Sequence, residues 1–209
     1  MLGALALAGA FVLPAGPTMA AGAGAAYTCT GGDIPTGNYR SITVTGVCDV
    51  PADAVINVVG NLNVVAGAVL DAQSAPSTIT VGRNVTGTDT MVVLLNGVTV
   101  KGNVTLSGGG SEEIPWSIKN NTVGRNFSVS GITDEWLGVM FNQIGGNANL
   151  SNITLHDVDP GAPGVYVVEN HVARNLNCSG LVPGVSGGFI PGEVNHVGGR
   201  ANGQCAPLV

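Results

Sequence analysis

The sequence has few charged residues, few aromatic side chains and no cluster of basic ones. Charged residues make up 10% of the 209 residues and aromatic residues 4%, and the seven basic residues form no run. Because nucleic-acid binding requires a dense positive surface, we do not expect a nucleic-acid partner. The net charge of −6 identifies neither a cationic substrate nor an anionic membrane as a partner.

No segment shows the 3.6-residue hydrophobic stripe of an amphipathic helix. Hydrophobic types reach 44% and glycine 33 residues. This balance favours many short strands joined by turns rich in glycine and asparagine, because these residues tolerate positive φ where a chain bends sharply. The length fits one domain with a substantial core.

Residues 1–26 resemble a secretory leader. They contain no charged side chain, begin with an apolar run that is interrupted by Pro14 and Pro17, and end in small residues. The apolar run is too short to span a bilayer, so we expect no transmembrane segment in the mature chain. We predict a signal peptide over 1–26, a single domain over 27–209, and a secreted, extracellular or envelope-associated protein.

An asparagine followed by a usually apolar residue recurs through the chain. The six positions are Asn61, Asn84, Asn103, Asn126, Asn147 and Asn175. Five steps lead from the first to the last, which gives a period of about 23 residues, within the range of solenoid proteins. A second column of asparagines lies five residues before the corresponding position of the first column, at Asn121, Asn142, Asn170 and Asn195.

Asparagines at equivalent bends of a parallel stack lie about 4.8 Å apart. Such an asparagine can adopt the left-handed conformation and pass an amide hydrogen bond to the next coil, contributing on the order of 1 kcal/mol. We therefore expect asparagine ladders in both columns. We expect the first column to be largely buried in one file along the axis.

Short runs of alternating apolar and polar residues lie between the asparagines, as in 42–44, 78–81 and 98–100. Alternation places one face of a strand inside and the other outside. Residues 91–95 and 164–168 depart from it, which suggests strands that are covered on both faces. The sequence thus predicts an all-β chain, a single right-handed parallel β-helix of about seven coils. A leucine-rich repeat has a similar period, but its L-x-x-L-x-L frame is absent.

Four cysteines form two pairs that are local in sequence, Cys29 with Cys48 and Cys178 with Cys205. Three disulfide connectivities are formally possible. A fold in which each coil contacts only its neighbours favours the local pairs, so we predict two disulfides that close the ends of the β-helix. A metal site is the alternative, but no C-x-x-C spacing occurs.

The last two repeats, 170–178 and 195–205, resemble uncharacterised secreted β-helix proteins of actinobacteria and related bacteria. Such proteins typically repeat a phrase of the form N-x-V-G-G-N-L and end in G-Q-C, and the opening from Cys29 to Cys48 is also similar. This chain departs from the phrase at 173–174 and at Arg200. The resemblance implies the fold and the compartment, and no catalytic residue.

A carbohydrate-active enzyme would need clustered carboxylates as acid, base or calcium ligands. The candidates are Glu112 with Glu113, Asp134 with Glu135, and the sequence His-Asp-Val-Asp at 156–159. Glycine and proline lie beside the first and third groups, so we interpret these acids as solvated loop residues.

Two further columns could bind a ligand. His171 and His196 occupy one column and could share a metal, although Thr122 and Gln143 in the same column indicate an outward polar file. Arginines precede the ladder asparagine in alternate coils, with glycine in the coils between them. Such a row could bind an acidic glycan or simply be solvated. These arginines are Arg83, Arg125 and Arg174.

An ice-binding face would need ranks of outward threonines, but the offsets of the available threonines vary from coil to coil. They are Thr43, Thr80, Thr99, Thr105 and Thr154. The sequence favours a non-catalytic, secreted structural or surface-binding module of the cell envelope or extracellular space. A polysaccharide or envelope component is the expected partner, and no cofactor or metal is expected. The alternative is a polysaccharide lyase or hydrolase of the pectin-lyase-like kind, by analogy of fold.

Overall fold

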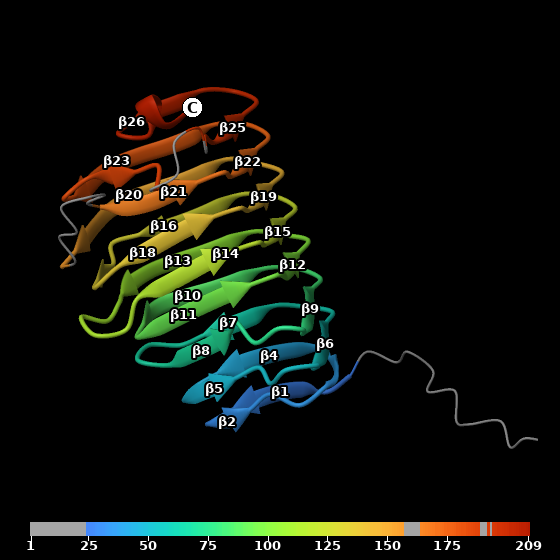
Figure 1. Cartoon of the computed structure of the whole chain (residues 1–209). Coiled ribbons are helices and arrows are strands. Elements are labelled where there is room, and N and C mark those ends of the chain that lie inside the picture. Colours follow the sequence, from blue (N-terminus) through green and yellow to red (C-terminus); the bar gives the residue numbers. More distant parts are fainter. Residues whose placement is uncertain (1–23, 157–163, 189–191, 193) are drawn as a thin grey trace, which may run out of the picture.

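The chain forms a parallel β-helix of about seven turns that winds through three sheets (Figure 1). The computed structural model describes residues 24–156, 164–188, 192 and 194–209. All strand pairs are parallel, and each strand pairs with the equivalent strand of the neighbouring coil. The predicted all-β solenoid is confirmed.

The first sheet contains β1 (Ala26–Cys29), β4 (Ser41–Val44), β7 (Leu62–Val64), β10 (Val85–Thr90), β13 (Val104–Gly109), β16 (Phe127–Ser130), β20 (Ala148–Leu155), β23 (Leu176–Val182) and β26 (Ala201–Gly203), with β17 (Thr133–Asp134) paired to β20. The second sheet contains β2 (Gly32–Asp33), β5 (Val47–Asp49), β8 (Val69–Ala72), β11 (Val92–Asn96), β14 (Trp116–Lys119), β18 (Leu137–Met140), β21 (Val165–Val168) and β24 (Val185–Ser186). The third sheet contains β3 (Gly37–Tyr39), β6 (Val55–Val58), β9 (Thr78–Val81), β12 (Val98–Val100), β15 (Thr122–Val123), β19 (Gln143–Ile144), β22 (His171–Val172) and β25 (His196–Val197).

Each coil passes the first, second and third sheets in that order, so three bends repeat along the axis. We call them the first bend, from the first to the second sheet, the second bend, from the second to the third sheet, and the third bend, from the third sheet to the first sheet of the next coil. The chain ends in a short 3-10 helix, η1 (Ala206–Leu208).

The core is built by the alternation that the sequence predicts. In β4, Ile42 and Val44 are buried while their neighbours face outward, and Ile42 stacks in register on Leu62 of the next coil. Each fully buried aliphatic side chain of this kind contributes about 1.5–3 kcal/mol of hydrophobic stabilisation. Register is therefore fixed, because a slip by one residue would turn the apolar file outward.

Two strands of the second sheet are covered on both faces, as their sequences predict. In β11 the outward Leu94 is 8% exposed, and in β21 the outward Tyr166 is 5% exposed. Tyr166 packs against Trp136, with ring centroids 5.1 Å apart. The middle of the second sheet is consequently closed to solvent on its outer side near these residues.

The six asparagines of the first column form one ladder along the third bend, as predicted. The Oδ1 atom of Asn103 accepts hydrogen bonds from the backbone N–H and the Nδ2 atom of Asn126, at 3.1 and 3.3 Å. The same pattern links each asparagine backbone to the preceding rung. The ladder ends where the backbone N–H of Arg200 donates to Asn175. The prediction of burial is wrong, because these side chains are half-buried or exposed.

The buried ladder is the second column, at the second bend. Asn121, Asn142, Asn170 and Asn195 are at most 3% exposed. The Oδ1 atom of Asn142 accepts from both nitrogens of Asn121, and its own Nδ2 donates to Asn170 Oδ1 at 2.9 Å and to the carbonyl of Ile118 at 3.0 Å. In this ladder the side-chain N–H group of each asparagine donates to the next asparagine toward the C-terminus. In the ladder of the third bend it donates toward the N-terminus.

The ladder asparagines do not adopt the left-handed conformation that the sequence suggested. Among the described residues, a positive φ falls one position earlier at Asn120, Phe141 and Glu169, just before three of the four buried asparagines. The preceding residue therefore makes the bend, which leaves the asparagine side chain free to hydrogen-bond inward.

Two disulfides lie near the two ends, Cys29–Cys48 and Cys178–Cys205, as predicted. Each joins neighbouring coils, and both are consistent with an oxidising environment. The predicted leader over 1–26 lies almost entirely outside the described residues, and β1 begins at Ala26. No helix in the described part of the chain is long and apolar enough to cross a bilayer.

Candidate ligand-binding groove

An unbroken polar file follows the outer face of the third sheet. One residue per strand, in register over eight strands, points outward. The file consists of Asn38, Asn57, Thr80, Thr99, Thr122, Gln143, His171 and His196. We call it the third-sheet polar file. Hydroxyl, amide and imidazole groups all donate and accept hydrogen bonds, so the file suits a ligand rich in hydroxyl groups.

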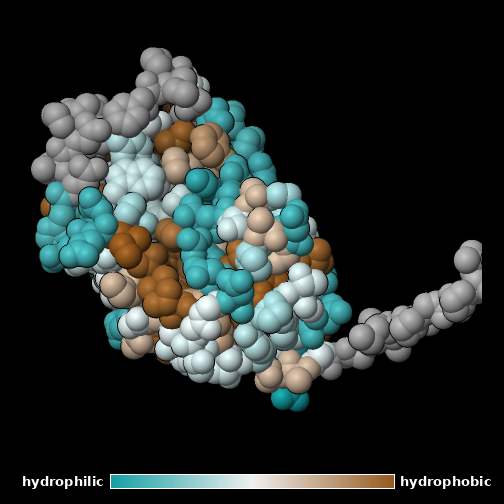
Figure 2. Space-filling model, turned by 60° about the horizontal axis from the view of Figure 1, so that its bottom comes forward, coloured by the Kyte–Doolittle hydropathy of each residue, from teal (hydrophilic) through white to brown (hydrophobic). Residues whose placement is uncertain are grey.

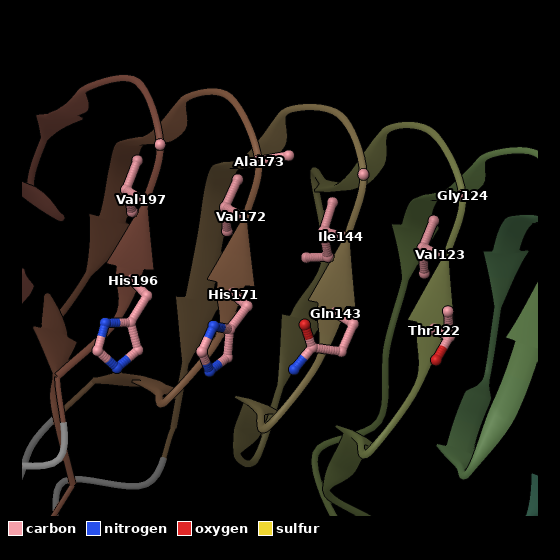
Figure 3. A pocket seen from close by; sticks show the side chains of 12 residues that line it. Thr122, Val123, Gly124, Gln143, Ile144, His171, Val172, Ala173, His196 and Val197 are labelled. Atoms are coloured by element: carbon pink, nitrogen blue, oxygen red, sulfur yellow. The ribbon is translucent and has the colours of Figure 1, made fainter.

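A shallow groove of about 650 Å³ runs beside the C-terminal half of this file. Thr122, Gln143, His171 and His196 stand in a row along it, one on each of four coils (Figure 3). The two histidine rings are stacked, with centroids 4.6 Å apart. The row is exposed and extends parallel to the axis of the β-helix, so the groove is open along its length.

Glycines form the floor of the groove where the third bend begins. A Cβ atom at Gly124 would lie 2.5 Å from the carbonyl oxygen of Lys101, and one at Gly145 would lie 2.6 Å from that of Gly124. The close approach of successive coils therefore requires glycine at these two positions, whereas the same column holds Lys101 and Ala173 in other coils. Because these glycines have no side chains, their peptide groups are exposed and the surface is recessed beside the polar file.

The next position of the third bend alternates between arginine and glycine in every coil. The order, traced by backbone hydrogen bonds between coils, is Arg40, Gly60, Arg83, Gly102, Arg125, Gly146, Arg174 and Gly199. A Cβ atom at Gly102 would lie 2.5 Å from Asn84 Oδ1, and Gly146 and Gly199 meet the preceding ladder asparagine in the same way. The four arginines, which we call the arginine row, therefore stand two coils apart.

Two smaller hollows extend the groove toward the N-terminus. One is lined by Arg83, Lys101 and Arg125 with the glycines beside them, and the other by Asn57, Thr80 and Lys101 with Gly82. These hollows share Lys101, and Arg125 adjoins the glycine floor of the main groove. Together they cover the third bend along most of the β-helix. We refer to the groove and the two hollows together as the third-bend groove.

Among the described residues, the carboxylates that the sequence offered for catalysis lie at the first bend, away from this groove. Glu112 lies 3.5 Å from His156 Nε2, and both are exposed. Asp157 and Asp159 lie outside the described residues. Asp134, which the sequence offered as a candidate acid together with Glu135, has a fully buried side chain.

Asp134 is a structural acid of the first bend. Its Oδ1 accepts from the backbone N–H of Ser111 at 3.0 Å, and its Oδ2 from that of Trp116 at 2.9 Å. Burial raises the pKa of this carboxyl to about 7, against the lowering effect of these hydrogen bonds and with a small raising effect of Glu135. Asp134 thus ties the loop before β14 to the coil that follows.

His171 and His196 lie in register on neighbouring strands, as their shared column predicts, and their rings stack. No group of three or more His, Cys, Asp or Glu residues that could hold a metal ion occurs among the described residues. Both rings belong to the third-sheet polar file, as the neighbouring Thr122 and Gln143 indicated.

The threonines considered for an ice-binding face lie on different surfaces. Thr80 and Thr99 belong to the third-sheet polar file, and Thr43 and Thr105 face outward from the first sheet. Figure 2 shows hydrophobic residues in separate areas with hydrophilic ones between them on the face that it presents. That face offers no single apolar docking surface.

Comparisons with known proteins add no relative. No protein-family model matches the chain, and no curated protein or solved structure is significantly similar to it. The resemblance to secreted actinobacterial β-helix proteins therefore stays a prediction.

Sequence reasoning found Arg83, Arg125, Arg174 and the histidine pair but missed Lys101 and Arg40 as members of one bend. Lys101 directly precedes Gly102 and Asn103 in the repeat, and Arg40 precedes Ser41 at the position that the ladder takes in the next coil. A register extended by one coil toward the N-terminus would have found Arg40, and a comparison of the position before the arginine column would have found Lys101.

Proposed function

We propose that this protein is an exported, non-catalytic binding module that holds a polysaccharide of the cell envelope or extracellular space in the third-bend groove. The observation that carries this proposal is the third-sheet polar file beside a glycine floor, aligned with the axis over successive coils. A linear polymer needs a long, open site rather than an enclosed pocket, and this groove is open along its length.

The scaffold supports such binding because it holds the groove rigidly. The buried ladder of the second bend begins one residue before the polar file, and the ladder of the third bend follows the arginine row directly. In the C-terminal half of the file, each outward side chain from Thr122 to His196 is thus placed by a hydrogen-bonded ladder on both sides. Preorganisation of this kind lowers the entropic cost of binding.

The placement of the acids favours binding over cleavage. Polysaccharide hydrolysis or elimination needs carboxylates or a base beside the bound sugar. The groove is lined by threonine, glutamine, histidine, glycine and apolar residues, and its adjoining hollows add arginine, lysine and asparagine. Catalysis in this groove would therefore lack an acidic partner among the described residues that line it.

A polysaccharide array probed with the purified, disulfide-bonded protein tests the proposal, with release of soluble products followed in parallel. We expect retention on at least one polysaccharide and no product release. A variant with His171→Ala and His196→Ala should bind more weakly, because it loses two neighbouring polar groups of the file. A matched control with Thr105→Ala and Ser128→Ala changes two outward residues on neighbouring strands of the first sheet and should bind normally. Cleavage of any polymer, or equal loss in both variants, contradicts the proposal.

A further inference from the structure

We infer that the third-bend groove selects an acidic β-1,4-linked polysaccharide, whose carboxylates pair with the arginine row. This inference rests on the proposed function and names its ligand class. Four features carry it: the segregation of charge, the spacing of the arginines, their exposure without partners, and the polar file that runs beside them.

The cations of this acidic chain gather on one bend. Of the seven basic residues, all but Lys119 lie at the third bend: Arg40, Arg83, Lys101, Arg125, Arg174 and Arg200. No Asp or Glu occurs in the segments that form this bend, 40–41, 59–61, 82–84, 101–103, 124–126, 145–147, 173–175 and 198–200. A local positive strip on a molecule of net charge −6 attracts a polyanion to this bend and repels it elsewhere.

The spacing of the arginine row is set by the fold. Successive coils lie about 4.8 Å apart, so arginines in alternate coils recur about every 9.6 Å. The intervening Gly60, Gly102 and Gly146 keep the guanidinium groups from stacking directly on one another, where like charges would repel. Each arginine has room to turn toward a ligand on the surface.

This spacing matches an extended glycan better than an extended peptide. In a two-fold β-1,4-linked chain, every second sugar presents its carboxylate on the same edge, and this repeat is roughly 10 Å, close to two strand spacings. On one edge of an extended peptide, side chains recur about every 6.6 Å, so acidic residues would fall out of register with the row. An acidic polysaccharide lying along the axis can meet Arg83, Arg125 and Arg174 with consecutive disaccharides.

The arginines are available to bind. All four are exposed, and among the described residues none of them takes part in an ion pair. A guanidinium group can form two parallel hydrogen bonds with a carboxylate, which lysine cannot do. Each exposed pair contributes little by itself, so appreciable affinity requires that several form together on one polymer.

The groove also offers a surface for the sugar rings that lie between the carboxylates. The floor at Gly124 and Gly145 lies directly beside Arg125, and the third-sheet polar file stands on the far side of that floor. A sugar ribbon held by carboxylates at the arginine row would cover the glycines and present its hydroxyl groups to Gln143, His171 and His196. Charge thus determines which polymer binds, and the polar file provides hydrogen bonds to its hydroxyl groups.

Titration calorimetry with matched oligosaccharides tests the inference. The probes are β-1,4-linked oligoglucuronate and the neutral cello-oligosaccharide of the same length, which differ in their carboxylates alone. α-1,4-linked oligogalacturonate supplies the same charge with another spacing, and polyglutamate supplies it on a peptide. We expect oligoglucuronate to bind most tightly, with an affinity that falls as salt is added, because exposed ion pairs are screened.

The matched variants replace arginine by glutamine, which retains hydrogen-bonding capacity without charge. Arg83→Gln, Arg125→Gln and Arg174→Gln should each weaken oligoglucuronate binding by roughly threefold, and the triple variant by roughly thirtyfold. Lys119→Gln removes a charge away from the third bend and should leave binding unchanged. Thermal unfolding of every variant should match the parent, because these side chains form no hydrogen bond or ion pair within the described part of the chain.

The outcomes separate the two proposals. Equal binding of the neutral oligosaccharide, unaffected by the arginine variants, overturns the inference and leaves a binding module for neutral glycans. Equal binding of oligogalacturonate overturns the match in spacing, and tighter binding of polyglutamate overturns the glycan as ligand. Failure to bind any polysaccharide, charged or neutral, overturns the proposed function as well.

Discussion

Each buried asparagine of the second bend completes hydrogen bonds in the coils on both sides of it. Asn142 joins Asn121, Asn170 and the carbonyl of Ile118 at 1% exposure, whereas Asn126 makes the equivalent ladder contacts at an exposed bend. Water can replace the partners of Asn126 but cannot reach those of Asn142. The two ladders, which look alike in sequence, therefore differ in energy.

We predict that Asn142→Ala lowers the free energy of unfolding by about 3 kcal/mol or more, because it leaves several buried donors and acceptors unpaired. Asn126→Ala, in the exposed ladder, should cost about 1 kcal/mol. Urea unfolding of both variants, with disulfides intact, measures the difference. Equal losses would show that burial does not distinguish the ladders.

Asp134 should make stability depend on pH. Its pKa rises from 3.8 in the unfolded chain to about 7 in the folded protein, so the folded state holds the proton more strongly. The free energy of unfolding should therefore fall as pH rises from about 4 to about 7, by roughly 1.4 kcal/mol per unit of pKa shift, and level off above that.

Asp134→Asn supplies the comparison. The side-chain oxygen of the new asparagine can still accept a hydrogen bond from the backbone N–H of Ser111. Its side-chain N–H group would instead face the backbone N–H of Trp116, so the variant should be less stable in acid. Its stability should also lack this dependence on pH. Denaturant midpoints across the pH range give the difference in stability between the parent and the variant. A difference in stability that does not change with pH would contradict the raised pKa of Asp134.

The sequence predicted where each asparagine column lies in the repeat, but it did not predict which column is buried. The columns containing Asn103 and Asn121 both follow the repeat, and spacing alone cannot say which bend faces the core. The neighbours could have distinguished them, because arginine next to Asn84 and Asn126 indicates a bend open to water. The elevated pKa of Asp134 depends on a buried loop contact that no short motif predicts.

The strands and bends fit together because glycine occupies the points where coils approach most closely. At Gly102, a Cβ atom would lie only 2.5 Å from Asn84 Oδ1, an atom fixed by two hydrogen bonds to Asn103. Neither the ladder nor the bend can move without breaking those bonds. The bend therefore has no space for a methyl group.

We predict that Gly102→Ala destabilises the protein by about 1–3 kcal/mol through overpacking. Gly187→Ala is the matched control, since the Cβ atom would meet Leu208 alone among the described residues, at an ordinary 3.5 Å. Thermal or urea unfolding compares the two variants. A Gly102→Ala protein as stable as the control would mean that the third bend is not tightly packed.

The disulfides should act on the ends of the stack. In a repeat protein each coil contacts mainly its neighbours, so opening can begin at an end and spread inward. Replacing Cys29 and Cys48 by alanine should lower hydrogen-exchange protection in β1, β2 and β4 and leave β13 to β16 protected. Uniform loss of protection along the chain would instead indicate that the whole β-helix unfolds as one unit.

At the scale of elements, alternation predicted most of the fold. The apolar runs at 91–95 and 164–168 correctly indicated strands covered on both faces, since a one-sided strand would expose Leu94 and Tyr166. The first-bend loops could not be predicted in the same way. Their packing, as at Ser111 and Trp116, depends on residues from different coils.

The whole molecule separates its charges around the axis. All basic residues except Lys119 occupy the third bend, and Glu112, Glu113 and Asp134 lie at the first bend, so the groove and these candidate acids occupy different bends. The sequence contained every member of the arginine row, but only the three-dimensional register shows that the row, the glycine floor and the third-sheet polar file lie side by side. A short sequence motif cannot show that residues from different coils lie side by side on one surface.

The location of the bound glycan tests this account most directly. Amide resonances of the isotopically labelled protein can be followed while β-1,4-linked oligoglucuronate is added. The account predicts that the largest shifts occur at Gly124, Arg125, Gly145 and His171, and that the outward residues of the first sheet, such as Thr105 and Ser128, remain unchanged. Shifts centred on the first sheet, or on the first bend around Glu112 and His156, would contradict it.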